Sequence, residues 1–194
     1  MKLTSICVYC GSSFGQSPRY RNAAARLGAL LAERKITLVF GGGGVGLMGA
    51  LAQAALSAGG EVVGVIPRFL RRAERGLDRL TRLEVVESMH ARKERMFALA
   101  DAFIVLPGGF GTLDETVEML TWRQLGLHDK PIVLIDLDGY WHPLSRLADH
   151  ILESGFAQPS TRRLLCLVPS PEAAIATLAE APEPAISPAA PERL

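Results

Sequence analysis

Two glycine-rich segments of the chain have the composition of loops that bind phosphate. The first is GGGGVGLMG at residues 41–49, and the second is PGGFGT at residues 107–112. Each follows an apolar run and precedes a helical pattern, so its backbone N–H groups and the helix dipole point toward one place that favours an anion. Glycine also marks tight turns without any ligand. Two such turns in one chain nevertheless favour ligand binding over a purely structural role.

The spacing of these glycines favours a monophosphate over larger nucleotides. The first loop matches G-x-G-x-x-G twice, but the nearest acidic residue, Glu61, begins the next strand instead of ending it, which disfavours NAD. No G-x-x-x-x-G-K-[ST] motif is present, so a Walker-type triphosphate site is not supported. We predict phosphate contacts at Gly43 and Gly44, and at Thr112 either a helix cap or a hydroxyl that reaches the phosphate.

Two charged residues interrupt apolar helical stripes beside the second loop. Arg92 shares a helix face with Met89, Met96 and Leu99, and Glu115 lies on the face of Met119. Both helices flank the expected strand at residues 102–106, so both groups are expected at the carboxyl edge of the sheet, where ligands bind in this class. A structural ion pair is the alternative. The neighbouring glycine loop favours a functional site.

Other motifs have simpler structural explanations. The sequence GSSFG at residues 11–15 matches G-x-S-x-G but lacks the context of a hydrolase elbow. Cys7 and Cys10 have C-x-x-C spacing within an expected strand, which indicates buried residues instead of a redox pair. The four histidines and three cysteines show no metal-ligand spacing, so we predict no metal. The arginines of residues 68–82 form a local basic segment, normally a solvated loop.

The elements that must position these residues alternate between strands and helices. Strands are expected at seven places: residues 5–10, 37–40, 61–66, 83–86, 102–106, 131–135 and 164–168. Helices are expected at six: residues 18–34 and 46–58, one capped by Ser88, one from Thr112 to about Gly126, residues 141–154, and one starting at Ser170. Several strands are continuously apolar, as in a parallel sheet covered on both faces. The pattern predicts an α/β fold with one doubly wound, mainly parallel Rossmann-like sheet.

Length and composition agree with one globular domain. We expect residues 1–180 to form the nucleotide-binding domain and residues 181–194, rich in proline and alanine, to form a mobile tail. A net charge of +1 gives no general attraction to nucleic acid or anionic lipid. The apolar runs are too short to span a bilayer, no signal peptide is recognised, and three cysteines do not make a disulfide framework. We therefore expect a cytoplasmic protein without membrane or nucleic-acid partners.

The motifs resemble those of a known family at matching separations. The sequence MHARK at residues 89–93 precedes PGGFGTLDE at residues 107–115, and CGSS, GGGGVGLMGALAQAAL, VIPRFL and LTWRQLGLHDKPIVLID extend the match over about residues 5–155. On these motifs the chain resembles the LOG ("lonely guy") family. Its members are cytokinin riboside 5′-monophosphate phosphoribohydrolases, long mislabelled as lysine decarboxylases.

The resemblance implies a Rossmann-like homodimer that uses no cofactor. It implies hydrolysis of the N-glycosidic bond of N6-substituted or plain adenosine 5′-monophosphate (AMP), which releases the free base and ribose 5-phosphate. Arg92 and Glu115 match the catalytic pair of the family. The substrate contacts that the resemblance implies are Glu74, Arg92, Lys93, Gly108, Gly109, Phe110, Gly111, Thr112, Leu113, Asp114 and Thr121.

That chemistry passes through an oxocarbenium-like state, whose positive charge Glu115 is suited to stabilise, or Glu115 orients the attacking water. Arg92 then holds the ribose phosphate side or assists the leaving purine. Two alternatives stay open. A non-catalytic nucleotide carrier or sensor needs the same glycine loops but not Glu115. A decarboxylase using pyridoxal phosphate needs a Schiff-base lysine, for which Lys93 is the sole plausible candidate.

Overall fold

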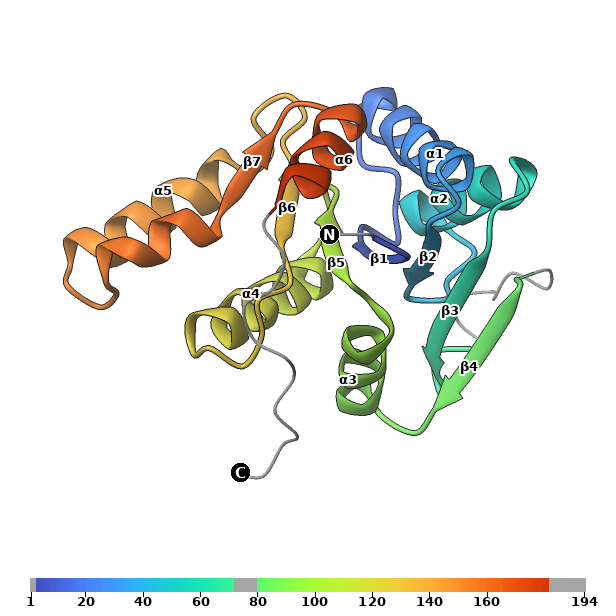
Figure 1. Ribbon diagram of the computed structural model, residues 1–194, viewed down its shortest axis with the longest axis horizontal. Coiled ribbons are helices and arrows are strands. Elements are labelled where there is room, and N and C mark those ends of the chain that lie inside the picture. The colour runs from blue at the N-terminus through green and yellow to red at the C-terminus, as the bar shows by residue number, and fades with distance from the viewer. Residues whose placement is uncertain (1–2, 72–79, 182–194) are drawn as a thin grey trace.

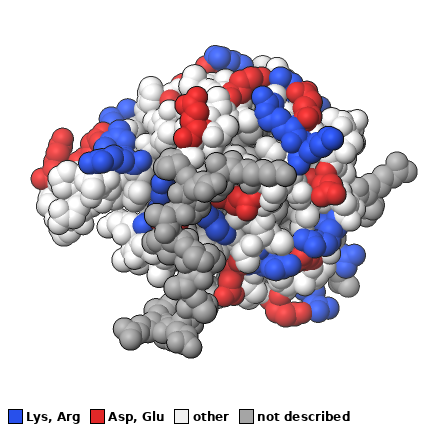
Figure 2. All heavy atoms as spheres, in the orientation of Figure 1, with Lys and Arg blue, Asp and Glu red and all other residues white. Residues whose placement is uncertain are grey.

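The computed structural model describes residues 3–71 and 80–181. Two of the predictions fall outside these ranges: Glu74 as a substrate contact, and the mobile tail from residue 182 onward. Within the described residues, no helix is both long and apolar enough to cross a membrane. On the face shown in Figure 2, acidic and basic side chains are interspersed.

Seven parallel strands form one sheet in the described residues, which confirms the predicted fold class. The strands are β1 (Ser5–Tyr9), β2 (Thr37–Phe40), β3 (Val62–Pro67), β4 (Arg82–Val86), β5 (Ala102–Val105), β6 (Ile132–Ile135) and β7 (Cys166–Val168). Their order in the sheet is β4-β3-β2-β1-β5-β6-β7. The order reverses direction at β1, which pairs with both β2 and β5. A crevice therefore opens at the carboxyl ends of β1 and β5, as is usual for ligand sites in open α/β sheets.

Helices cover both faces of the sheet (Figure 1). They are α1 (Pro18–Glu33), α2 (Gly46–Ser57), α3 (Met89–Leu99), α4 (Phe110–Gln124), α5 (His142–Glu153), the 3₁₀ helix η1 (Pro159–Leu164) and α6 (Pro171–Glu180). One core joins α1, α2 and α6 to the sheet, and a second core joins α3 and α4 to its other face. Gly28 lets α1 pack closely on α2, because an added Cβ would lie 2.2 Å from the carbonyl oxygen of Leu51.

The start of α4 differs from the prediction. The helix begins at Phe110 instead of Thr112, and its N-cap is Gly109, which offers no side-chain cap. The predicted capping role of Thr112 is therefore wrong. Thr112 lies in the first turn, almost fully buried, and an added Cβ on Gly108 would lie 2.1 Å from its hydroxyl. Glycine at position 108 thus allows the loop from β5 to pass close to the first turn of α4.

Asp101 ties the start of β1 to the turn before β5. Its Oδ2 accepts hydrogen bonds from the backbone N–H of Thr4 at 2.8 Å, the hydroxyl of Thr4 at 2.7 Å and the backbone N–H of Ser5 at 2.9 Å. Burial alone would raise the pKa of Asp101, but these hydrogen bonds outweigh it and hold that pKa below its ordinary value.

We expect Asp101→Ala to lower the free energy of unfolding by about 1–2 kcal/mol at pH 7, since three hydrogen bonds to a carboxylate are lost. Because the pKa is depressed in the folded state, this stabilisation is present above the unfolded-state pKa, about 3.9, and is lost as the pH falls through the folded-state value. Urea unfolding of both proteins from pH 7 to pH 3 measures the difference. If the difference in the free energy of unfolding between the two proteins stays constant or grows on acidification, this account is contradicted.

Candidate functional site

The loops after β1 and β5 meet at the reversal point of the sheet. The N–H of Gly11 donates to the carbonyl oxygen of Pro107 at 3.0 Å, and an added Cβ on Gly11 would lie 3.3 Å from the Cα of Gly108. Glycines at these two positions thus let the two loops touch. The contact places the second glycine loop directly beside the end of β1.

Arg92 and Glu115 meet in a cavity of about 220 Å³ at this point. Arg92 comes from α3 and is 6% exposed, and Glu115 comes from α4 and is 7% exposed. The Nη2 atom of Arg92 lies 4.0 Å from Oε1 of Glu115. The cavity is lined by Val8, Tyr9, Cys10, Ser12, Gly41, Met48, Met89, Arg92, Met96, Gly109, Phe110, Gly111, Thr112 and Glu115. The structure therefore brings the two predicted charges into one cavity with the second glycine loop.

Apolar and sulfur-bearing side chains surround this charged pair. The Nη2 atom of Arg92 donates a hydrogen bond to the carbonyl oxygen of Gly41 at 3.2 Å, and its Nη1 atom lies 3.8 Å from the sulfur of Met89. Tyr9 and Cys10 are almost fully buried in the cavity wall. Burial, and then the nearby Glu115 carboxylate, raise the pKa of Cys10, so its thiol stays protonated and is unsuited to act as a nucleophile.

The two glycine loops differ in what their amides can bind. In α2, the N–H groups of Leu47 and Met48 both point to the carbonyl oxygen of Gly11, at 3.0 and 3.4 Å. In α4, the N–H of Leu113 bonds to Gly109 at 3.0 Å, and the three residues between them line the cavity. The first amides of a helix have no acceptor within that helix and attract anions. The start of α4 is therefore the better anion site.

The predicted phosphate contacts of the first loop are not brought to this cavity. Among the described residues that line it, Gly41 and Met48 come from that segment, whereas Gly43 and Gly44 are not included. Their contact with phosphate stays a prediction that the geometry does not support.

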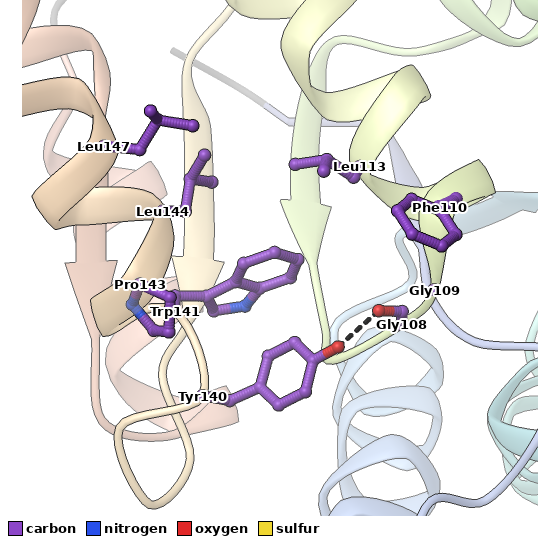
Figure 3. Close-up of a pocket in the computed structure, with 9 residues that line it drawn as sticks. All are labelled: Gly108, Gly109, Phe110, Leu113, Tyr140, Trp141, Pro143, Leu144 and Leu147. Atoms are coloured by element: carbon purple, nitrogen blue, oxygen red, sulfur yellow. Dashed lines mark hydrogen bonds between the residues drawn. The ribbon is translucent and has the colours of Figure 1, made fainter. Parts of the chain in front are cut away.

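A second, apolar cavity of about 480 Å³ also adjoins the second glycine loop (Figure 3). It shares Gly109 and Phe110 with the first cavity and lies between the start of α4 and the start of α5. Its lining consists of Gly108, Gly109, Phe110, Leu113, Tyr140, Trp141, Pro143, Leu144 and Leu147. The hydroxyl of Tyr140 donates to the carbonyl oxygen of Gly108 and so fixes the loop from this side.

Three other residues predicted to contact the substrate, Lys93, Asp114 and Thr121, line neither cavity. Lys93 forms ion pairs with Glu118 at 3.1 Å and with Asp114 at 3.2 Å. Burial alone would lower the pKa of Lys93, but the two carboxylates outweigh it and raise that pKa, opposite to the shift that a Schiff-base lysine needs. Thr121 is exposed, and its hydroxyl donates to the carbonyl oxygen of Val117 at 2.8 Å.

Comparisons with known proteins show the family to which the chain belongs. The model of the family described as "Possible lysine decarboxylase" matches residues 48–178. The Arabidopsis thaliana protein named cytokinin riboside 5′-monophosphate phosphoribohydrolase LOG7 is 46% identical over 175 residues, which cover 90% of this chain and 81% of that protein. Its Arabidopsis relative LOG1, of the same name, is 45% identical over 169 residues, covering 87% and 79%.

Solved structures share the fold at lower sequence identity. The molybdenum cofactor binding protein of the phototrophic bacterium Rippkaea orientalis has a TM-score of 0.69 and 23% identity, and the match covers 92% of this chain and 97% of that chain. At this identity the similarity concerns the fold alone.

Proposed function

Since the chain belongs to the family of cytokinin riboside 5′-monophosphate phosphoribohydrolases, we propose that it hydrolyses the N-glycosidic bond of an adenosine 5′-monophosphate, N6-substituted or plain. The products are the free base and ribose 5-phosphate. The observation that carries the proposal is the nearly buried Arg92–Glu115 pair, 4.0 Å apart, in a cavity lined by the first turn of α4.

The first turn of α4 is suited to hold the phosphate. Gly109, Phe110, Gly111 and Thr112 line the cavity there, and the positive end of the helix dipole adds to the attraction of their amides for an anion. A phosphate at this point anchors the ribose beside Glu115, which lies on the same helix one turn further on.

Glu115 then faces the atom at which positive charge develops. Cleavage of the glycosidic bond creates an oxocarbenium-like ribosyl group, and a fixed carboxylate in a water-poor cavity stabilises it or orients the attacking water. A guanidinium does not release a proton at neutral pH, so Arg92 acts as a fixed positive charge and not as a general acid. It counters the phosphate, or the electron density that moves onto the leaving purine.

The apolar cavity supports a substrate whose base carries an apolar substituent. It adjoins the Arg92–Glu115 cavity across Gly109 and Phe110 and is walled by Leu113, Trp141 and Leu144. A base held near Phe110 directs an N6-substituent toward these side chains, where burial of each CH₂ contributes about 0.8 kcal/mol.

Incubation of the protein with AMP, with N6-isopentenyl-AMP and with adenosine, followed by chromatography, tests the proposal. We expect free base and ribose 5-phosphate in equal amounts from both nucleotides, and far less base from adenosine, which lacks the phosphate. Binding of nucleotide without release of base by the wild-type protein contradicts hydrolysis and favours a carrier or sensor.

Tyr140→Phe is expected to raise KM for the nucleotide about 3- to 10-fold with little change in kcat, because the variant loses the hydrogen bond that fixes the carbonyl group of Gly108. Steady-state kinetics measures both constants. Tyr20→Phe is the matched control, since the ring of Tyr20 packs edge-on against that of Tyr140, 5.8 Å away. Equal changes in KM for the two variants argue against a specific role of the Tyr140 hydroxyl.

We also propose that the protein is a homodimer. On α4, Phe110 and Val117 are 92% and 44% exposed, Leu125 just after the helix is 67% exposed, and α5 has no buried residue. Association of two copies through these helices buries that apolar surface. Sedimentation at micromolar concentration should give twice the 20.9 kDa of one chain, and Val117→Glu should shift it toward the monomer. A wild-type protein that sediments as a monomer contradicts this assembly.

A cytoplasmic location is part of the same proposal. All three cysteines are free thiols, two of them buried, which suits a reducing compartment. Fluorescence of a tagged full-length protein in its own cells tests the location, and labelling confined to an extracytoplasmic compartment contradicts it.

A further inference from the structure

Gly41 is in direct contact with the guanidinium group of Arg92. Its carbonyl oxygen accepts a hydrogen bond from Nη2 of Arg92 at 3.2 Å. An added Cβ on Gly41 would lie 1.9 Å from the same Nη2 atom and 3.0 Å from Cζ. A side chain at position 41 and the present position of the guanidinium therefore exclude each other.

The backbone does not require glycine at position 41. Seven glycines of the described residues have a positive φ, and Gly41 is not among them. The next neighbour of the added Cβ is the sulfur of Met48 at 3.2 Å, which belongs to a flexible side chain that can yield. The steric demand for glycine at this position thus comes from Arg92.

We propose that Gly41 is a positioning residue that seats Arg92. Its carbonyl group holds Nη2, and its missing side chain leaves the space in which the guanidinium lies 4.0 Å from Glu115. The inference rests on the proposed function, because it assigns Gly41 a role in that reaction through Arg92. The first glycine loop then serves the site by placing a cation, while the start of α4 holds the phosphate.

A double-mutant cycle of Gly41→Ala and Arg92→Ala in the full-length protein tests this role. A displacement of a positioned group by about 1 Å costs about 10²-fold in rate, so we expect Gly41→Ala to lower kcat/KM for AMP by about 10²-fold, mainly through kcat. In the Arg92→Ala background the same change is expected to alter kcat/KM by less than about threefold, because the methyl group then has room. Equal losses in both backgrounds overturn the proposal.

The melting temperatures of the same four proteins give a second double-mutant cycle that does not depend on activity. Gly41→Ala is expected to lower it in the wild-type background and to leave it nearly unchanged in the Arg92→Ala background. If Gly41→Ala alone does not fold, the double variant is expected to fold again, and failure to do so overturns the proposal. A wild-type protein without hydrolase activity refutes the proposed function, while the melting temperatures still decide whether Gly41 seats Arg92.

Gly126→Ala is the control for a general loss of stability. Gly126 follows α4 with a φ of 74°, so alanine is strained there, but it lies outside both cavities. It should lower the melting temperature similarly in both backgrounds and leave kcat/KM unchanged. A loss of kcat/KM in Gly126→Ala as large as that in Gly41→Ala means that destabilisation alone explains the effect, which also overturns the proposal.

Discussion

Glu115→Gln is expected to lower kcat about 10³-fold, equivalent to about 4 kcal/mol of transition-state stabilisation. The change keeps the size of the side chain but removes the negative charge that, in the proposed mechanism, faces the developing ribosyl cation. Because the phosphate site that we propose is the first turn of α4 and not the carboxylate, KM should change less than about threefold. Steady-state kinetics with AMP and with N6-isopentenyl-AMP measures both constants.

Glu118→Gln is the matched control for this variant. Glu118 lies one turn after Glu115 on the same helix, is also largely buried, and pairs with Lys93 at 3.1 Å without lining the Arg92–Glu115 cavity. We expect its kcat to stay within about fivefold of the wild type. A Glu115→Gln protein that retains wild-type kcat removes Glu115 from the mechanism.

Arg92→Ala is expected to lower kcat/KM about 10³-fold, because a nearly buried positive charge at the proposed position of the reacting sugar is lost. Arg92→Lys should restore less than a tenth of the lost activity. A lysine ammonium is a point charge and does not reproduce the planar guanidinium, whose Nη2 contacts Gly41 and approaches Glu115 while its Nη1 lies beside the sulfur of Met89. The kinetics are compared with those of Lys93→Ala, the neighbouring cation on α3.

The two cations differ in what surrounds them. Lys93 is engaged by Asp114 and Glu118 outside the cavity, whereas Arg92 lines it. We therefore expect Lys93→Ala to act mainly on KM. If Arg92→Lys has wild-type kcat/KM, only the charge at position 92 matters, and the geometric account of Arg92 is refuted.

The sequence predicted the elements well because their signals are local. Short β-rich runs, several of them continuously apolar, marked all seven strands, and residues such as Ser88 and Ser170 marked helix starts that the structure confirms. The helical spacing of Arg92 and Glu115 also placed both charges correctly on inward faces. The start of α4 was missed because its N-cap, Gly109, has no side chain that signals a cap.

The residues that contact Arg92 and the second glycine loop from other elements could not be predicted, because they are distant in the sequence. Gly41 and Arg92 are 51 positions apart, and Gly108 and Tyr140 are 32 positions apart. Their contacts depend on the order of strands, which places β1 between β2 and β5 and which no local pattern reveals. Without that order, the sequence predicts an anion site in the glycine-rich segment 41–49, with contacts at Gly43 and Gly44. The structure instead gives the amides at the start of α2 an acceptor in Gly11.

A crystal structure of Glu115→Gln with bound AMP tests the central claim most directly. The account predicts the phosphate at the first turn of α4, with its oxygens within hydrogen-bond distance of the amides between Gly109 and Leu113, and the ribose C1′ between Arg92 and residue 115. A nucleotide bound at the start of α2, or anywhere that leaves C1′ out of reach of both side chains, contradicts it.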